Sequence, residues 1–357
     1  MLTAESVKKM ARALGADAVG IGSMDRWEGA PIQMDPRQIM PEAKSCIAMA
    51  FRVFRGSLRG IEEGTFFSNY SAMGYGGLTY LYMPLTVINL CKYIEDEGYE
   101  ALPMGHQSDW RAIDNEGNFR GGSRPVAEGR AAPDVMVHLR IAGFLCGLGE
   151  IGWSKVFLTP QFGPRQRLGL VFTEAELEPD PIYNGPKLCN RCKACVKFCP
   201  GQAIPAEKSV KVTLAGHEVE WADVDMKACG HAFVGASMEP NDALTPEETY
   251  LERDGHRYGP SFISPFKHKP RNLYNTGQAV CGGRGCMRAC MISLENRKVL
   301  SNQFKEKFRR RKPWTIDWSQ PAPALDASPA PRPVAAAKPP APASAPGVQI
   351  PKAYEPD

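Results

Sequence analysis

Four closely spaced cysteines constrain this chain of 357 residues more than any other feature. The segment from Cys189 to Pro200 has the sequence CNRCKACVKFCP, which is a C-x₂-C-x₂-C-x₃-C-P run. In runs of this form three thiolates bind one [4Fe–4S] cube, and the fourth binds a neighbouring cube. Two cubes need eight thiolates, so four more cysteines are required outside the run. The downstream sequence supplies Cys229, Cys281, Cys286 and Cys290.

The exchange of ligands between the two runs predicts which cysteines share a cube. We expect the first cube to be held by Cys189, Cys192, Cys195 and Cys290. We expect the second cube to be held by Cys199, Cys229, Cys281 and Cys286. The downstream run departs from the usual spacing, because four residues separate Cys281 from Cys286 and Met291, instead of Pro, follows Cys290.

Disulfide bonds and zinc fit these cysteines less well than iron–sulfur clusters. Disulfide frameworks are typical of short secreted chains. Zinc sites commonly use two C-x₂-C pairs and do not need a four-cysteine run that ends in Pro. The other three cysteines lie in apolar stretches, where a free thiol behaves as a small buried hydrophobe. We therefore expect core positions for Cys46, Cys91 and Cys146.

The composition is that of an ordinary globular protein, with 43% hydrophobic and 23% charged residues. A net charge of +4 does not by itself indicate binding to nucleic acid. No stretch approaches the roughly 20 apolar residues of a membrane span. The N-terminal sequence has neither an apolar signal core nor a twin-arginine leader, and thiolate ligands suit a reducing compartment. The sequence predicts a cytoplasmic protein without a membrane span, and we expect no nucleic-acid partner.

Alternating helix and strand signals predict a layered α/β domain over residues 1–180. Residues Thr3–Leu14 are expected to form a helix with Thr3 as its N-cap. The apolar runs 18–22 and Ser45–Val53 are typical of buried strands. Longer apolar stretches predict helices over Leu78–Gly98 and Leu139–Gly149.

The rest of the chain divides into four further segments. The polar residues 106–132 predict either a lid over a pocket or a solvated insertion. Two apolar runs within residues 156–173 predict a hairpin. Residues 181–300 are expected to form a two-[4Fe–4S] domain like that of bacterial ferredoxins. Residues 301–318 are basic and predict a solvated helix end, with nucleic-acid contact as the less favoured alternative. Residues 319–357 are rich in Ala and Pro and predict a disordered tail or tether.

The segment from Gly147 to Thr173, GLGEIGWSKVFLTPQFGPRQRLGLVFT, resembles the corrinoid-dependent reductases, the group that joins reductive dehalogenases and epoxyqueuosine reductases. The resemblance continues through residues 176–180 into the cysteine run and covers about residues 1–300, with gaps. The sequence GLGEIG…TPQFGPRQRL is more similar to the motif of the dehalogenases than to the GLGWIGK motif of the queuosine enzymes. The single Cys229 between the two runs also matches the eighth ligand of the family.

The resemblance implies an α+β fold, in which a nitroreductase-like α/β sandwich that binds cobalamin precedes the two-cluster domain. It implies an oxidoreductase that takes electrons from a low-potential donor such as ferredoxin or flavodoxin. These electrons would pass through two [4Fe–4S] clusters to the cobalamin, which reduces a small organic substrate, with a carbon–halogen bond as one candidate target. We expect the cofactor pocket to include Gly147, Gly149 and Trp153.

The resemblance also points to candidate catalytic residues. In the dehalogenase-like pattern an arginine near this segment faces the active site, where a fixed cation can stabilise a developing anion. Arg165 and Arg167 are the candidates, and we favour Arg167 because its strand is more apolar. Asp134 lies near the position of the family's proton donor, shifted by about one residue, although it could equally cap the following helix. Tyr75 is the alternative acid.

Two other functions remain compatible with the sequence. The chain could be a two-cluster electron-transfer or activating protein that serves a partner enzyme and has no substrate chemistry of its own. It could also be an epoxyqueuosine reductase-like enzyme of tRNA modification, but an Ala/Pro-rich tail stands where such enzymes commonly carry a tRNA-binding extension. We therefore favour the dehalogenase-like reductase.

Overall fold

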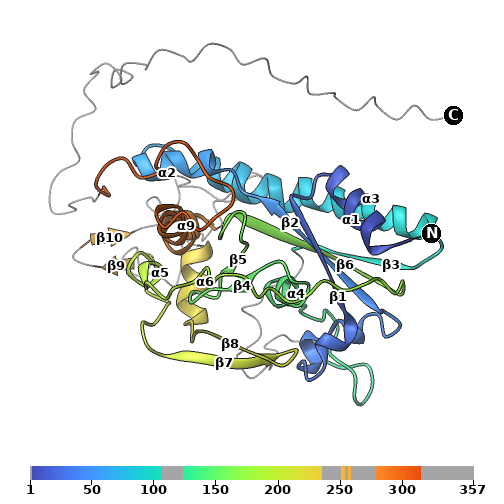
Figure 1. Cartoon of the computed structure of the whole chain (residues 1–357). Helices are drawn as coiled ribbons and strands as arrows, with labels where there is room; N and C mark the ends of the chain where they lie inside the picture. The colour runs from blue at the N-terminus through green and yellow to red at the C-terminus, as the bar shows by residue number, and fades with distance from the viewer. Residues whose placement is uncertain (1, 107–123, 235–250, 254–255, 259–278, 315–357) are drawn as a thin grey trace, which may run out of the picture. The chain divides into compact units, whose positions relative to one another are not determined.

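The computed structural model of the protein describes residues 2–106, 124–234, 251–253, 256–258 and 279–314 (Figure 1). These residues belong to one compact unit, Met1–Ile316. A second unit, Asp317–Asp357, lies outside the described residues, and so does the predicted disordered tail. The boundary expected near residue 180 stays a prediction.

A four-stranded antiparallel sheet forms the centre of the N-terminal half. Its strands are β1 (Ala18–Ser23), β2 (Ser45–Arg52), β6 (Gln166–Thr173) and β3 (Ala101–Met104), in the order β1-β2-β6-β3. The register places Cys46 of β2 opposite Gly22 on one side and Phe172 on the other. Both N-terminal strands predicted from apolar runs are therefore confirmed.

Helices cover both faces of this sheet, as the alternating side chains of β2 show. Ile47, Met49 and Phe51 point into one core, which α1 (Ala4–Ala13) and α3 (Met83–Asp96) complete. Cys46, Ala48 and Ala50 point into the opposite core, which α4 (Leu139–Leu145) covers. Since both faces are covered, β2 is apolar from residue 46 to residue 51, and the helices on its two sides are visible in Figure 1.

The predicted helices begin and end close to their expected residues. The side chain of Thr3 accepts a hydrogen bond from the backbone N–H of Ser6, which confirms the N-cap of α1. The predicted helix over Leu78–Gly98 corresponds to the second half of a π-helix, η5 (Tyr70–Tyr82), and to α3. The remaining N-terminal helices are short, and they are η1 (Met24–Trp27), η2 (Ile32–Met34), η3 (Pro36–Gln38), η4 (Arg55–Leu58) and α2 (Arg59–Glu63).

The C-terminal half consists of short helices and hairpins. Its helices are α5 (Ala194–Lys197), α6 (Met226–Val234), α8 (Val280–Arg284) and α9 (Cys286–Asn296). Its strands are β7 (Ser209–Leu214), β8 (His217–Ala222), β9 (Leu251–Arg253) and β10 (His256–Tyr258), which pair as two hairpins. Two further strands, β4 (Glu150–Ile151) and β5 (Phe157–Leu158), pair with each other.

Two sequence predictions are wrong. The apolar runs within residues 156–173 do not form a hairpin with each other, because β5 pairs with β4 while β6 pairs with β2 and β3. The basic segment is not a solvated helix end. Residues 301–314 contain no helix, and Phe308 packs into the core at 2% exposure.

The mixed α/β character of the fold is confirmed. Within the described part of the chain, no helix combines the length and the hydropathy that crossing a membrane requires.

Candidate redox centre and adjoining cavity

The backbone of the cysteine run turns through residues with left-handed conformation. Arg191 has φ = 55° and Lys193 has φ = 59°, and each stands between two cysteines of the run. Ala279, two residues before Cys281, has φ = 62°. Only a few per cent of non-glycine residues adopt this conformation. Alternation of right- and left-handed residues turns successive backbone N–H groups toward one point, an arrangement found at many iron–sulfur sites.

The structure brings Cys290 to the first three cysteines of the run, although about one hundred residues separate them. Cys290 lies on α9, and α9 packs against α5, which carries Cys195. Burial raises the pKa of Cys290 well above the usual value, and the neighbouring thiols of Cys189, Cys195 and Cys192 raise it further. These three neighbours are the partners that the sequence predicts for Cys290.

The second predicted quartet also comes together. Burial raises the pKa of Cys286 well above the usual value, and the nearby thiols of Cys199, Cys281, Cys229 and, last, Cys195 of the first quartet add to the shift. The four side chains come from the end of the cysteine run, α6, α8 and the start of α9.

Both quartets fit a cube better than a single metal ion. Among the described residues, no three His, Cys, Asp or Glu side chains are grouped closely enough to hold one ion. A cube binds each thiolate through a different iron, so its four ligands stand farther apart than the ligands of one ion. Burial and neighbouring thiols raise the pKa of Cys195, Cys286 and Cys290, and a bound cationic cluster would reverse that preference. The donor set therefore fits two [4Fe–4S] clusters, as a proposal.

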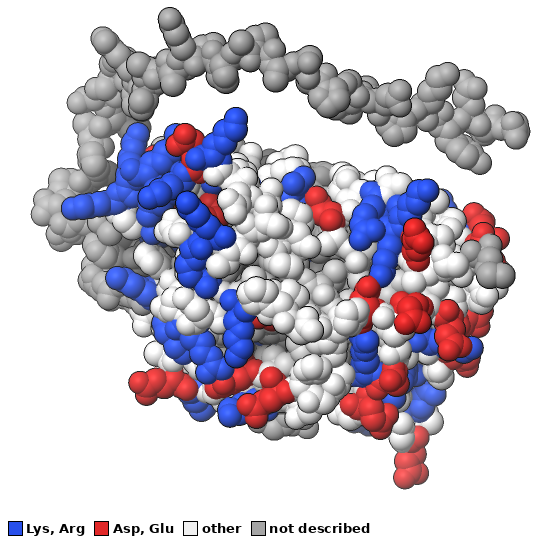
Figure 2. All heavy atoms as spheres, in the orientation of Figure 1, with Lys and Arg blue, Asp and Glu red and all other residues white. Residues whose placement is uncertain are grey.

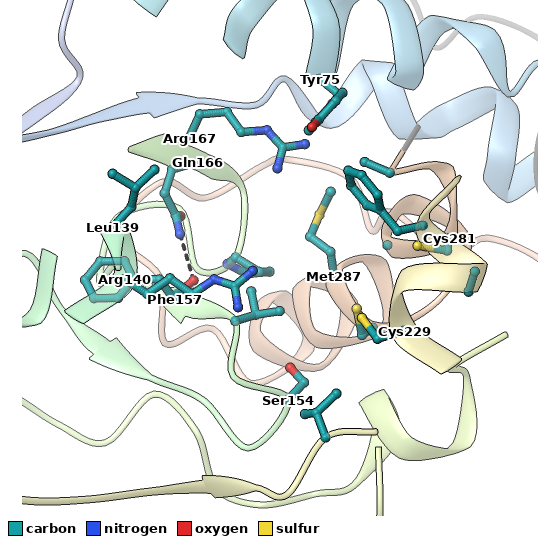
Figure 3. Close-up of a pocket in the computed structure, with 18 of the residues that line it drawn as sticks. Tyr75, Leu139, Arg140, Ser154, Phe157, Gln166, Arg167, Cys229, Cys281 and Met287 are labelled. Atoms are coloured by element: carbon teal, nitrogen blue, oxygen red, sulfur yellow. Dashed lines mark hydrogen bonds between the residues drawn. The ribbon is translucent and has the colours of Figure 1, made fainter. Parts of the chain in front are cut away.

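A cavity of about 200 Å³ lies against the second quartet. All four of its cysteines line this cavity, whereas Cys189, Cys192, Cys195 and Cys290 do not. Figure 3 shows Cys229 and Cys281 on one side of the cavity, Arg140 and Arg167 on the other, and Met287 between them. The cavity therefore separates sulfur donors from fixed cations.

Arg167 and Tyr75 meet at this cavity. The guanidinium of Arg167 lies 4.8 Å from the ring centroid of Tyr75 and donates to the hydroxyl of Tyr70 at 2.8 Å. The hydroxyl of Tyr75 shares a hydrogen bond of 2.9 Å with Tyr80. Burial raises the pKa of Tyr75 well above its usual range, Tyr80 adds to the shift, and Arg167 opposes it. Tyr75 therefore keeps its proton at all ordinary pH values.

Three cavity residues were not assigned a functional role from the sequence. Thr79, 1% exposed, carries a hydroxyl that has no hydrogen-bond partner among the described residues. His138 caps α4, and burial lowers its pKa well below the usual value, so its ring is neutral. Arg140 supplies a second cation at the wall. The π-helix that presents Thr79 has no sequence signature, so no pattern could have identified it.

The lining is otherwise largely apolar, with Val137, Leu139, Phe157 and Leu168 among its members. Cofactor pockets typically combine such a lining with a few polar groups that fix orientation. The partnerless hydroxyl of Thr79 adds a hydrogen-bonding group for a ligand. The chemistry of this lining suits a flat macrocycle with polar substituents such as cobalamin, and a cavity of about 200 Å³ would have to widen to hold the whole cofactor.

Two predicted catalytic residues do not line the cavity. Arg165 is fully buried and donates to the carbonyl of Val53 at 2.9 Å and to the side chain of Asn302 at 2.8 Å. It therefore ties the sheet to the C-terminal segment. Asp134 is exposed, with φ = 66°, and the following helix is capped by His138 instead. The predicted capping role of Asp134 is therefore wrong.

The three predicted cofactor residues also lie away from the cavity. A Cβ on Gly147 would stand 2.2 Å from the carbonyl oxygen of Pro181, and one on Gly149 would stand 2.0 Å from that of Leu158. Both glycines therefore allow close backbone packing. Trp153 contacts the first quartet instead, because its backbone N–H donates to the sulfur of Cys189 at 3.3 Å.

Comparison with known proteins finds homologues in two groups of reductases. No protein-family model matches the chain. Tetrachloroethene reductive dehalogenase of Desulfitobacterium hafniense is 44% identical over 68 residues, which are 18% of this chain and 12% of that protein. Epoxyqueuosine reductase of Gloeobacter violaceus is 26% identical over 247 residues, which are 61% of this chain and 66% of that protein. The matched segment thus spans only a small part of the dehalogenases.

Comparison with solved structures returns members of both groups. A catabolic reductive dehalogenase in complex with 3-bromo-4-hydroxybenzoic acid has a TM-score of 0.46 and 18% identity, over 84% of this chain and 38% of that one. Epoxyqueuosine reductase from Streptococcus thermophilus has a TM-score of 0.39 and 16% identity, over 59% and 55%. The sequence homologues confirm the expected resemblance to the corrinoid iron–sulfur reductases, and both branches are represented.

Proposed function

We propose that this homologue of reductive dehalogenases and epoxyqueuosine reductases is a corrinoid iron–sulfur oxidoreductase that reduces a small organic substrate. One observation carries the proposal. The four thiols of the second predicted quartet line the same cavity as Arg167 and Tyr75. An electron carrier, a fixed cation and a proton donor are the components that a reductive cleavage needs.

In this proposal Cys189, Cys192, Cys195 and Cys290 hold one [4Fe–4S] cluster, and Cys199, Cys229, Cys281 and Cys286 hold the other. When bound in the cavity, cobalamin supplies a polarisable metal centre for reductive chemistry that side chains cannot perform. Thr79 would donate a hydrogen bond to it, and the apolar wall around Phe157 would exclude water. Thiolate ligands of this kind suit a reducing compartment such as the cytoplasm.

Arg167 and Tyr75 have separate tasks at the substrate. Arg167 is held by Tyr70 and by the carbonyl of Gly74, so its charge is positioned before substrate arrives. A preorganised cation can stabilise a leaving anion such as a halide. Tyr75 is protonated and faces the cavity, so it can donate the proton that replaces the leaving group. Donation leaves a phenolate, which Arg167 is placed to stabilise.

Anaerobic reconstitution tests the proposal. The purified chain should hold roughly eight iron atoms, since each cube contains four, and about one cobalamin. Cys199→Ser should remove the second cluster and leave about four. Iron without cobalamin, under cobalamin-replete expression, would favour the two-cluster electron-transfer protein.

Single substitutions test the proton donor. With an active substrate in hand, Tyr75→Phe should lower turnover about 10²–10⁴-fold, whereas Asp134→Asn should leave turnover nearly unchanged. The reverse order would identify Asp134 as the acid.

Epoxyqueuosine reduction is the second candidate, because the match to that reductase extends over 61% of this chain. It predicts turnover on tRNA that carries epoxyqueuosine. Dehalogenation of a halogenated phenol or alkene without any activity on that tRNA would exclude it.

A further inference from the structure

The first cysteine quartet reaches the molecular surface. Cys192 is exposed, whereas Cys195 and Cys199 are buried, and the second quartet faces the internal cavity. The sulfur of Cys192 lies 3.4 Å from the hydroxyl of Ser293, so the exposed edge of this quartet lies between α5 and α9. An electron from an external donor would therefore reach the first quartet before the second.

Cationic residues flank Cys192 along the cysteine run and follow Ser293 at the end of α9. We call them the basic rim, and they are Lys187, Arg191, Lys193, Lys197, Arg297 and Lys298. Lys187, Arg191, Lys197 and Lys298 are exposed. Figure 2 shows Lys and Arg gathered on the side of the molecule where α5 and α9 lie, with acidic groups lower down toward the hairpin of β7 and β8.

The carboxylates that contact this region offset only part of the charge of the basic rim, since Glu150 interacts electrostatically with Lys187 and Arg297. Glu220 pairs with Arg191, and Glu295 pairs with Arg55 across the molecule at 2.9 Å. Glu150 turns inward and accepts the backbone N–H of Cys189 at 2.6 Å. Lys197 and Lys298 are exposed and form no ion pair among the described residues.

We propose that the basic rim around Cys192 is the docking surface for an acidic one-electron carrier protein of the flavodoxin type. The inference rests on the cluster ligands of the proposed function. In each encounter the carrier loses one electron and the first cluster gains it, and no bond or proton changes place. Opposite charges would steer this encounter, and electron-transfer contacts are typically small and transient.

The same surface is poorly suited to single-stranded RNA. Such RNA is bound by positive grooves combined with aromatic side chains on which bases stack. Within residues 181–200 and along α9, no large aromatic side chain is among the highly exposed residues of the described chain. Trp153 lies beneath Lys193, whose ammonium is 3.0 Å from the ring centroid, and only 4% of Trp153 is exposed.

Charge reversal on the full, reconstituted chain tests the docking surface. The test variant is Lys187→Glu with Lys298→Glu. The matched control is Lys9→Glu with Arg12→Glu, which makes the same change in net charge on α1, far from α5 and α9 in Figure 1. The probe is a bacterial flavodoxin, with cytochrome c as a basic protein for comparison. The Kd of each of these two proteins for the chain is measured by calorimetry at low salt and at tenfold higher salt. Reduction of the clusters is followed by stopped-flow absorbance.

We expect the test variant to weaken flavodoxin binding and slow cluster reduction at least about tenfold at low salt, and the control variant to change either less than about twofold. Higher salt should reduce the difference between them. Equal effects of the two variants, or tighter binding of cytochrome c than of flavodoxin, would overturn the proposal. The proposal would also be overturned if the test variant lost binding to a tRNA stem-loop while its flavodoxin binding stayed unchanged.

Failure of this inference can be separated from failure of the proposed function. Iron content and the visible spectrum show whether the clusters are present in each variant. A chain with both clusters but no cobalamin, still reduced through the basic rim, contradicts the proposed function alone. A chain that assembles no clusters contradicts both.

Discussion

Glu62 is a buried carboxylate that joins three separate parts of the chain. Its side chain is 6% exposed and pairs with Arg288 of α9, which is 3% exposed. Its other oxygen accepts from Arg309 at 2.7 Å. Glu62 therefore links α2, the helix that carries two proposed cluster ligands, and the segment 301–314.

Replacing Glu62 by Ala should destabilise the fold by about 3–5 kcal/mol, because it leaves the guanidinium of Arg288 buried without a carboxylate. Burial already lowers the pKa of Arg288 to about 10, with Glu62 as the main opposing influence. The loss is a large part of the roughly 5–15 kcal/mol that stabilises a typical domain. Since Arg288 lies between Cys286 and Cys290, we expect faster iron release as well.

Urea unfolding followed by circular dichroism measures the first effect, and chelator-induced iron loss measures the second. Glu63→Ala is the matched control. Glu63 is 30% exposed and its pairs with Arg59 and Arg311 are longer, at 3.5 and 3.7 Å, so its loss should cost about 0–1 kcal/mol. The reasoning fails if the two variants lose similar stability. Glu62→Leu combined with Arg288→Met should regain most of the loss, because well-packed apolar groups can replace a buried ion pair.

Three further predictions concern stability. Burial and two neighbouring cations keep the pKa of His138 far below its usual 6.5, so the unfolded chain binds a proton that the folded chain does not. The free energy of unfolding should fall as pH drops below about 6.5, by up to about 1.4 kcal/mol per pH unit. Urea titrations at several pH values should show a weaker pH dependence for His138→Gln. An unchanged pH dependence would assign the effect to other groups. Gly147→Ala should destabilise more than Gly98→Ala, although φ is positive at both (75° and 87°), because the new Cβ meets Pro181 only in the first; equal melting temperatures would show that the clash relaxes. Phe308→Ala should cost about 3–5 kcal/mol if residues 301–314 belong to the folded core, and a change below about 1 kcal/mol would show that they do not.

Features fixed by local spacing could be predicted from the sequence. Thr3 caps α1 because a short polar side chain one residue before an amphipathic run can satisfy free N–H groups wherever the helix packs. The apolar run at 45–53 had to become a buried strand. The cysteine run likewise limits its own sulfurs to one small region, since only two residues separate each of the first three.

Features that depend on pairing between distant segments were decided by the tertiary structure. Arg165 and Arg167 are two residues apart, yet Arg165 ties the sheet to Asn302 while Arg167 lines the cavity. Arg165 precedes β6 in a turn, so the alternation of a strand does not govern its direction. The pairing of β6 depends on the packing of β2 between two layers of helices. This pairing in turn decides which arginine meets Tyr75. Contacts of this kind are set by the closure of the whole core, because many local conformations satisfy the same short sequence and only one of them buries every apolar face.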